Sequence, residues 1–425
     1  MTMRVPLFSY GLLGLPLAFV AMPLYVYLPH LYSTRYGMAL STLGSLLLMS
    51  RLLDAVIDPV LGRWGDLLYV RSPRLALGVG ALSALGLLMG MTLLFASSWN
   101  PVNEPLLLLA VLMGTYTAYS MLSIVHQSWG GRLGGNETRR AKIVAWREGF
   151  GLLGVLTASV LPTWLEWGEW VLVFGATLLA GVWGLSRCPA PNSTDFQSGY
   201  PLREMFHPWR LPAWRWLMAT FVLSGLSSAL PATLFLFFIQ DRLQAPGLQA
   251  WYLAGYFLAA AASLPLWLAA VRRWGLMRSW LLGMLLAVIV FIWTAGLTRG
   301  DEGPFAWVCV LSGLALGADL SLPGALLTGL IIDQGDDRQR EGTYFGWWNL
   351  ASKMNLALAA GLALPLLDWL GYQPGNASQR GLEALTFSYA VLPCLMKLVA
   401  ASLLYWGLMQ QRLDTDRASC QNSSS

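Results

Sequence analysis

The sequence predicts an all-α membrane protein with twelve transmembrane helices in two six-helix bundles. Three observations predict it: the composition, the number of long apolar stretches, and the placement of basic residues between them. Of the 425 residues, 56% are hydrophobic and 12% are charged, whereas an ordinary soluble domain is about 25% charged. The net charge of +5 is not gathered into a patch, which argues against a nucleic-acid-binding domain.

Twelve stretches are long and apolar enough to cross a bilayer, which takes about 20 mostly apolar residues. The first stretch follows a single basic residue, Arg4, and shows no obvious cleavage site, so we expect a retained helix rather than a signal peptide. The predicted spans are Leu7–Leu28, Met38–Leu61, Leu75–Phe95, Leu106–Val125, Ile143–Trp164, Trp170–Leu185, Trp214–Phe238, Leu248–Val271, Leu276–Leu297, Phe305–Ile332, Tyr344–Leu370 and Leu382–Leu408.

The connections between these spans alternate in charge. Counted from the N-terminus, alternate connections together with the span ends beside them hold 20 of the 27 Lys and Arg residues, the opposite loops hold 4, and 3 lie deeper inside spans. Basic residues concentrate on the cytoplasmic side of a membrane protein. The bias therefore predicts an even number of helices, with both termini cytoplasmic.

The chain divides into two halves. A polar stretch rich in Pro, Ser and Asn separates the first six spans from the last six, and Arg-Trp-Gly follows both the second span (63–65) and the eighth (273–275). Six plus six related helices is a transporter architecture, with the solute site between the halves near the bilayer midplane. The predicted parts are an N-terminal bundle (1–187), a cytoplasmic linker (188–212), a C-terminal bundle (213–409) and a cytoplasmic tail (410–425).

Three charged residues lie inside the second span. Arg51, Asp54 and Asp58 are spaced by three and four residues, so they project from one helical face. Two carboxylates one turn apart in a low dielectric repel, and they persist by sharing a cation, by staying partly protonated or by pairing with Arg51. Pro59 leaves the carbonyl of Ala55 free nearby. We interpret this as a seat for Na⁺ or H⁺; the alternative is a structural charge network.

Other ionisable residues inside spans are also candidates, because such groups are costly in a membrane. Lys353 needs an anionic partner, for which the acids of the second span and Asp319 are available. Asp319 itself has either a site role or a packing role. Lys397 is interpreted as snorkelling or structural. His126 is interpreted as interfacial, with a proton relay as the alternative.

Polar and aromatic residues at three further positions could reach a solute. Arg147 either points into a cavity from the cytoplasmic end or anchors the helix as a positive-inside residue. Tyr116 on the fourth span and Trp348 on the eleventh could stack on sugar rings, although membrane aromatics also serve in lipid belts and packing.

Two motifs resemble a known family. The run GRWGD at 62–66 resembles the loop signature of the major facilitator superfamily. The run RLLDAVIDP at 51–59 resembles the signature R-x-x-D-A-x-x-D-P of glycoside–pentoside–hexuronide:cation symporters, the melibiose-carrier group. Segments at 137–147 and 333–353 are similar to that group's loop into helix 5 and to its helix 10–11 region.

The resemblance implies roles for particular residues. It implies that Asp54 and Asp58 carry the coupling cation, with Thr117 as a polar neighbour, that Arg147 contacts substrate and that Lys353 couples the two sites. We expect the loop around Gly62, Asp66 and Arg71 to latch the inward side. Further candidates for solute contact or coupling are Arg51, Tyr116, Ser120, Asp319, Trp348 and Asn349.

The sequence also departs from the melibiose carrier. That carrier has an amide just before its second helix 2 aspartate, where this chain has Ile57, and two sugar-binding acids where this chain has Ser120 and Pro16. Losing the amide removes a neutral oxygen ligand, which Na⁺ needs more than H⁺ does. The sequence therefore favours H⁺ over Na⁺, and the missing acids argue against galactoside recognition.

The sequence thus predicts a cation-coupled symporter of a small organic solute, a sugar or glycoside, without cofactor or catalytic residues. We expect a monomer in the inner membrane of a bacterium-like cell, with the solute, the coupling cation and the bilayer as partners. One alternative keeps the fold and carries a lysolipid or another amphiphile. A distant alternative, a lipid-modifying membrane enzyme, needs an acid/base or metal cluster, and no such motif is present among the three separated histidines.

Overall fold

The computed structural model is all-helical over the residues that it describes, in agreement with the predicted fold class. It describes residues 7–20, 23–28, 31–32, 36, 38, 40–96, 104–161, 164–190, 202–336, 340–372 and 378–422.

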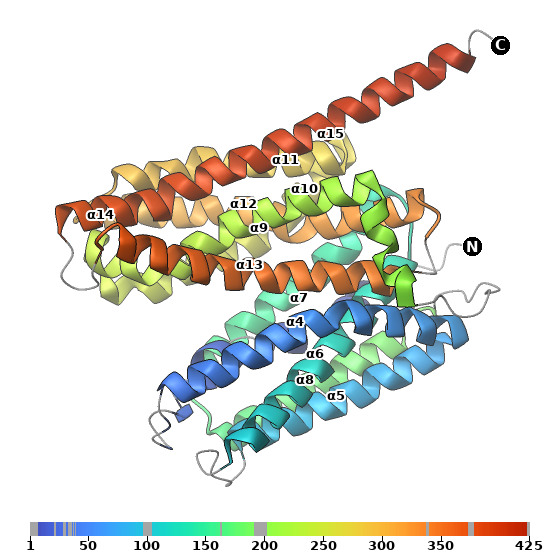
Figure 1. The fold of residues 1–425 in the computed structure, drawn as a ribbon, viewed down its shortest axis with the longest axis horizontal. Helices are drawn as coiled ribbons and strands as arrows, with labels where there is room; N and C mark the ends of the chain where they lie inside the picture. Colours follow the sequence, from blue (N-terminus) through green and yellow to red (C-terminus); the bar gives the residue numbers. More distant parts are fainter. Residues whose placement is uncertain are drawn as a thin grey trace. The chain divides into compact units, whose positions relative to one another are not determined.

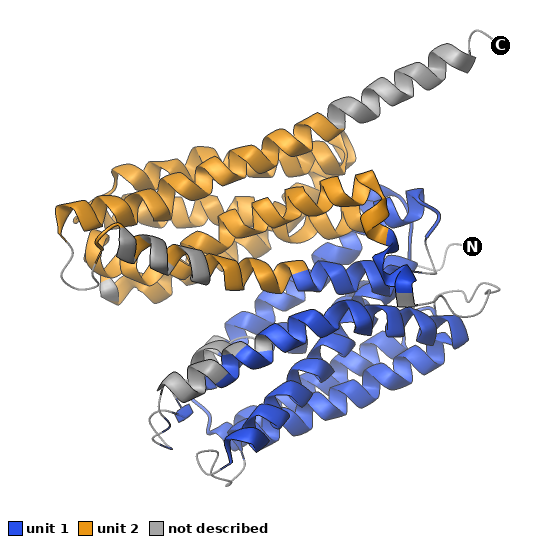
Figure 2. Ribbon diagram, in the orientation of Figure 1, with its two compact units in different colours: residues 1–207, 328–350 blue, residues 208–327, 351–425 orange. Residues whose placement is uncertain are grey.

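The chain forms two compact units. Unit 1 contains residues 1–207 and 328–350, and unit 2 contains residues 208–327 and 351–425 (Figure 2). The border does not coincide with the polar linker alone, because the segment 328–350 from the second half of the chain packs with the first half.

Unit 1 is built mainly from five long helices, with short elements before and after them (Figure 1). The helices α5 and α6 pack side by side, α4 packs on both, and α2 packs on α7 and α8. The elements are α1 (Leu7–Gly11), α2 (Gly14–Phe19), η1 (Pro23–Tyr27), α4 (Leu40–Arg71), α5 (Pro73–Phe95), α6 (Pro105–Arg132), α7 (Glu137–Val160), α8 (Trp167–Ser186) and η3 (Leu202–Arg210).

Unit 2 holds the remaining elements, except that α12 and α13 each contribute one end to unit 1. In unit 2, α15 packs against α9 and α11. The elements are α9 (Pro212–Phe237), η4 (Phe238–Leu243), η5 (Pro246–Leu248), α10 (Gln249–Trp274), α11 (Leu276–Phe291), η6 (Ile292–Gly296), α12 (Glu302–Asp333), α13 (Glu341–Trp369), α14 (Gln379–Thr386), η7 (Phe387–Val391) and α15 (Leu392–Asn422).

Each predicted span falls on helical structure, and eight helical segments among the described residues are long and apolar enough to cross a membrane. One local prediction was wrong: Gly62, Asp66 and Arg71 lie in the continuous helix α4 rather than in a loop. Charge ends the apolar run but does not end a helix, and the first break comes where Ser72 caps α5 and Pro73 begins it.

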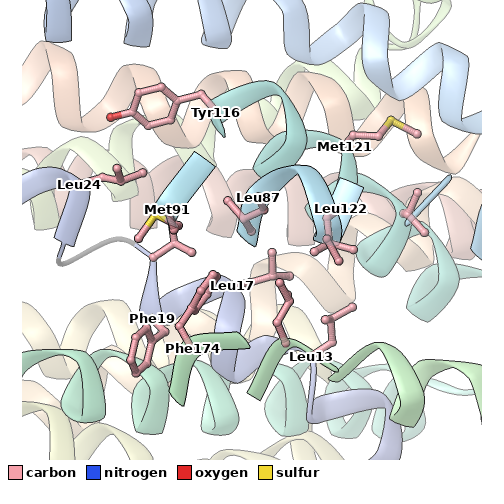
Figure 3. Packing of buried hydrophobic residues seen from close by; sticks show 14 of the residues in the cluster. Leu13, Leu17, Phe19, Leu24, Leu87, Met91, Tyr116, Met121, Leu122 and Phe174 are labelled. Atoms are coloured by element: carbon pink, nitrogen blue, oxygen red, sulfur yellow. The ribbon is translucent and has the colours of Figure 1, made fainter. Parts of the chain in front are cut away.

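Each unit has its own apolar core. In unit 1, side chains from α2, α5, α6 and α8 converge, among them Leu17, Leu87, Leu122 and Phe174 (Figure 3). In unit 2, the ring of Phe238 stacks on that of Tyr389 with 4.2 Å between centroids. The polar groups described below are therefore set into otherwise apolar packing.

Candidate functional site

The acidic pair of α4 is buried inside unit 1. Asp54 is 2% exposed and Asp58 is fully buried, one turn apart on the same helical face. The hydroxyl of Ser120 on α6 donates a hydrogen bond of 2.8 Å to Oδ1 of Asp54. The structure thus joins two predicted site residues that are 66 positions apart in the chain, and the carboxylate gains a neutral oxygen beside it.

A polar strip continues along α6 from Ser120. Ser123 and Gln127 follow at spacings of three and four, which places all three on one face. The Gln127 amide donates to Ser123 Oγ at 2.9 Å and to Asn349 Oδ1 at 3.1 Å. Asn349 belongs to the part of α13 that packs in unit 1. The strip therefore leads from Ser120, which binds Asp54, to α13.

Asp66 caps the N-terminus of α13. Its carboxylate accepts hydrogen bonds from the backbone N–H groups of Gly342 (2.6 Å) and Thr343 (2.7 Å), and from the Thr343 hydroxyl (2.7 Å). The first N–H groups of a helix have no partner within the helix and carry its partial positive charge. A carboxylate from α4 therefore satisfies the start of a helix that lies 276 residues later in the chain.

Arg132 neutralises this cap. Its guanidinium lies 3.1 Å from Asp66 and 3.0 Å from Glu341, and it covers the ring of Tyr69 at 4.0 Å. All three charged side chains are nearly excluded from solvent. A buried ion network of this kind is strongly destabilised when one member is removed, because the others keep their desolvation cost.

Glycines bring α4 and α13 into direct backbone contact. A Cβ atom built on Gly346 would lie 2.6 Å from the backbone oxygen of Asp58, and one on Gly62 would lie 2.1 Å from that of Gly342. Small residues permit such close approach between membrane helices. The backbone of the acidic pair is therefore packed directly against the helix that Asp66 caps.

We expect Gly346→Ala to destabilise unit 1 by about 1–3 kcal/mol, because the added methyl group overlaps the Asp58 carbonyl and forces the helices apart. The thermal unfolding midpoint of the purified protein measures this. Gly114→Ala on α6 is the matched control, since a Cβ there meets nothing within 4 Å. Equal midpoints for the two variants would contradict the close contact.

A second ionic cluster ties the linker element η3 to the turn before α13. Arg340 lies 3.1 Å from Glu204 and 3.0 Å from Asp336, and His207 lies 3.3 Å from Asp336. The Tyr344 hydroxyl donates to Asp336 at 2.7 Å. Together with the Asp66 network, this cluster borders a cavity of about 10 Å³, which has room for about one water molecule. This end of unit 1 is closed.

Arg147 does not simply face outward as an anchor. Its guanidinium binds the Glu148 carboxylate at 2.7 Å, and the residue lines a small cavity with Tyr10, Gln127 and Thr328. His126 is fully buried within the protein, and its Nε2 lies 2.8 Å from the Tyr10 carbonyl oxygen. The helix that carries it continues beyond Val125 to Arg132, and its interfacial position in the membrane stays a prediction.

The remaining predicted residues are placed as follows. Tyr116 belongs to the core cluster of unit 1, Thr117 is half-buried on α6, and Trp348 is 8% exposed on α13. Arg71 is exposed at the end of α4, and the side chain of Arg51 lies outside the described residues. Lys353 is half-buried in the part of α13 that belongs to unit 2.

Asp319 is paired with Lys397, at 2.5 Å, within unit 2. Lys397 is 4% exposed and bound to an anion within the helix packing, so of the two interpretations of this lysine the structural one fits and the snorkelling one does not.

Sequence reasoning missed most of the network residues. Arg132, Glu204, Asp336 and Gln127 were not singled out, although Glu341 and Thr343 lie in a segment that was noticed for its resemblance. A usable signal of this network was the group of charged residues and glycines immediately before an apolar span. The partners themselves follow only from tertiary packing.

Comparisons with known proteins agree on one kind of fold. A family model described as MFS/sugar transport protein matches residues 9–406, whereas no curated protein matches the chain.

Among solved structures, three similar ones have TM-scores from 0.62 to 0.69. A bacterial homologue of the iron transporter ferroportin, in an outward-facing state, has 14% identity, a TM-score of 0.69 and coverage of 94% of this chain and 99% of its own. The E. coli fucose:proton symporter FucP has 14% identity, a TM-score of 0.64 and coverage of 94% and 98%. The human organic anion transporter TETRAN has 18% identity, a TM-score of 0.62 and coverage of 94% and 98%.

Proposed function

Because the chain belongs to the MFS/sugar transport protein family, and is therefore a multi-pass membrane transporter of a small molecule rather than an enzyme, we propose that it is a cation-coupled symporter. The proposed solute is a sugar or glycoside, and the proposed coupling ion is H⁺, with Na⁺ as the alternative occupant of the same carboxylates. The fucose:proton symporter among its structural neighbours is consistent with this coupling.

The observation that carries the proposal is the buried acidic pair of α4. Asp54 and Asp58 are both excluded from solvent, and an ionised carboxylate in such a place is costly unless a cation accompanies it. One bound H⁺ or Na⁺ removes that cost. The Ser120 hydroxyl beside Asp54 supplies one neutral ligand, while Ile57 supplies none where a relative has an amide, which favours H⁺.

The proposed mechanism is alternating access. Cation binding neutralises Asp54 and Asp58, and solute binding follows, so only the loaded or the empty carrier changes conformation. The Asp66 network then acts as the inner gate. Its residues are contiguous with the cation site, because Gly346 contacts the backbone of Asp58, four residues from the capped start of α13. A change in the charge of Asp54 and Asp58 therefore acts on α13, the helix that Asp66 caps.

The remaining parts of the proposal concern location and assembly. Most of the basic residues lie in alternate connections between the spans, among them the segment around the α4–α5 junction, and we place that side, with both termini, in the cytoplasm. We place the protein in the inner membrane as a monomer. The proposed division into an N-terminal bundle (1–187) and a C-terminal bundle (213–409) follows the family's six-plus-six plan.

The proposal is tested by uptake into proteoliposomes with an imposed H⁺ gradient or an imposed Na⁺ gradient. We expect a sugar or glycoside from a panel to accumulate under one of the gradients and to equilibrate without it. A panel of lysolipids in the same vesicles tests the amphiphile alternative. Equal uptake of every solute with and without a gradient would overturn the coupling, and accumulation of lysolipids alone would overturn the solute class.

A further inference from the structure

Unit 2 contains a shell of oxygen atoms around one buried ammonium group. Lys397 Nζ lies 2.5 Å from Asp319 Oδ2, 2.9 Å from Ser224 Oγ, 3.0 Å from Ser228 Oγ and 3.2 Å from the Ser224 carbonyl oxygen. An ammonium has three N–H donors, yet four oxygens surround it. All four contacts are hydrogen bonds that the ammonium donates, and together they enclose it with oxygens as ligands enclose a monovalent cation.

The shell is braced from outside. Asp319 Oδ1 accepts a hydrogen bond of 2.9 Å from the indole N–H of Trp280, which is fully buried. The Ser224 hydroxyl, which the ammonium contacts, lies 3.4 Å from the same carboxylate oxygen and donates to it. The ligands are thus held in place by α9, α11 and α12, while the lysine enters from α15.

Small residues in the sequence allow this convergence. A Cβ built on Gly283 of α11 would lie 2.4 Å from the Ala318 side chain, and one on Gly317 of α12 would lie 2.0 Å from Ser263 Oγ of α10. Ser224 and Ser228 lie one turn apart on α9, so both hydroxyls face the same point. Asp319, next to Ala318, is therefore fixed among three helices independently of Lys397.

We propose that Ser224, Ser228 and Asp319 form a monovalent-cation site whose cation is the chain's own Lys397 ammonium. The ligand class of the site is an ammonium-sized monovalent ion, and the lysine is a tethered occupant of it. If Lys397 only linked helices, a free cation could not take over its role after the side chain is removed. If the oxygens form a cation site, a free monovalent cation can occupy it in place of the lysine ammonium.

The site has a consequence for transport, which rests on the proposed function. Unit 2 carries its own cation, so the acidic pair of α4 in unit 1 is left as the place for an external coupling ion. Unit 2 therefore holds an internal positive charge and binds no exchangeable ion. The experiment that follows measures stability without transport, so its outcome and that of the uptake experiment are independent.

Lys397→Ala removes the occupant and leaves the oxygen shell. In choline chloride we expect the thermal unfolding midpoint of the purified variant to fall by several degrees from that of the wild type. At equal ionic strength, ammonium or methylammonium should restore it in a saturable manner, and K⁺, which is similar in size to ammonium, should restore it in part. The wild-type midpoint should not depend on which of these cations is present.

The matched control is Lys397→Ala combined with Asp319→Asn. This double variant keeps the space but lacks the anion, so ammonium should not raise its midpoint above the choline value. Rescue of the double variant to the same extent as the single one, or the same midpoint for Lys397→Ala in every salt, would overturn the proposal.

Failure of Lys397→Ala to fold is itself a readout. Expression and extraction are then carried out in ammonium and in choline, and the yield of monodisperse protein is measured. Recovery in ammonium alone supports the site, whereas no recovery in either salt overturns it. The reciprocal variant Asp319→Ala should be stabilised by formate, which matches the carboxylate that the variant lacks, and not by chloride at equal ionic strength. Equal midpoints in formate and chloride would also overturn the proposal.

Discussion

Asp66→Asn should open the closed end of unit 1 and reduce solute accumulation severely. The carboxylate accepts three hydrogen bonds from Gly342 and Thr343 and one from Arg132. An asparagine of the same shape has one acceptor oxygen, and its amide group faces donors. Loss of one charge from a buried ionic network costs about 3 kcal/mol or more, which corresponds to a shift of about a hundredfold in an equilibrium. The closed form is then no longer favoured.

Cysteine labelling measures the opening directly. Leu67 lines the small cavity beside Asp66, so Leu67→Cys, in a background whose four native cysteines are replaced by serine, reports access to this end. We expect slow labelling by a hydrophilic maleimide when Asp66 is intact and rapid labelling in Asp66→Asn.

The control for this prediction is Asp301→Asn. Asp301 also caps a turn, accepting from the Thr298 N–H at 2.8 Å, but it is solvent-accessible and local. It should leave both labelling and transport unchanged. Slow labelling at position 67 in Asp66→Asn would show that the cap does not hold the gate.

The fold was predictable from the sequence because bilayer physics leaves a strong local signal. Long apolar runs and the bias of basic residues mark each span without knowledge of packing. Helix ends were less predictable, and α4 shows why. The sequence 62–71 is charged at three positions, which ends an apolar span, but its backbone hydrogen bonds continue as a helix to Arg71.

The candidate site was predictable only in part, because sequence shows local spacing but not contacts between helices. Asp54 and Asp58 were found because their spacing is local and their presence in an apolar span is costly. The bond from Ser120 to Asp54 joins two helices, and neither residue indicates the other. Lys397 illustrates the limit: its sequence context fits snorkelling, whereas its burial depends on Asp319 from another helix.

The second large effect is expected for Asp58→Asn, which should abolish gradient-driven accumulation while leaving downhill exchange of solute. Asparagine is nearly the same size but neither binds a proton nor carries the charge that a cation must neutralise. One positive charge moved with the solute across 100 mV supplies about 2.3 kcal/mol, which drives about a fiftyfold accumulation. The variant should instead approach equal concentrations inside and outside.

Proteoliposomes loaded with solute separate the two processes. Uptake driven by an imposed potential and ion gradient measures coupling, and counterflow of labelled solute without a gradient measures exchange, which requires a folded carrier. Asp333→Asn is the matched control, since Asp333 is an exposed acid at the end of α12 and its loss leaves the buried pair intact. Asp58 is fully buried, so its substitution could also damage the fold. Retained counterflow together with lost accumulation would show that the carrier is folded and that ion coupling is what it has lost. Undiminished accumulation in Asp58→Asn would instead mean that the acidic pair is a structural charge network.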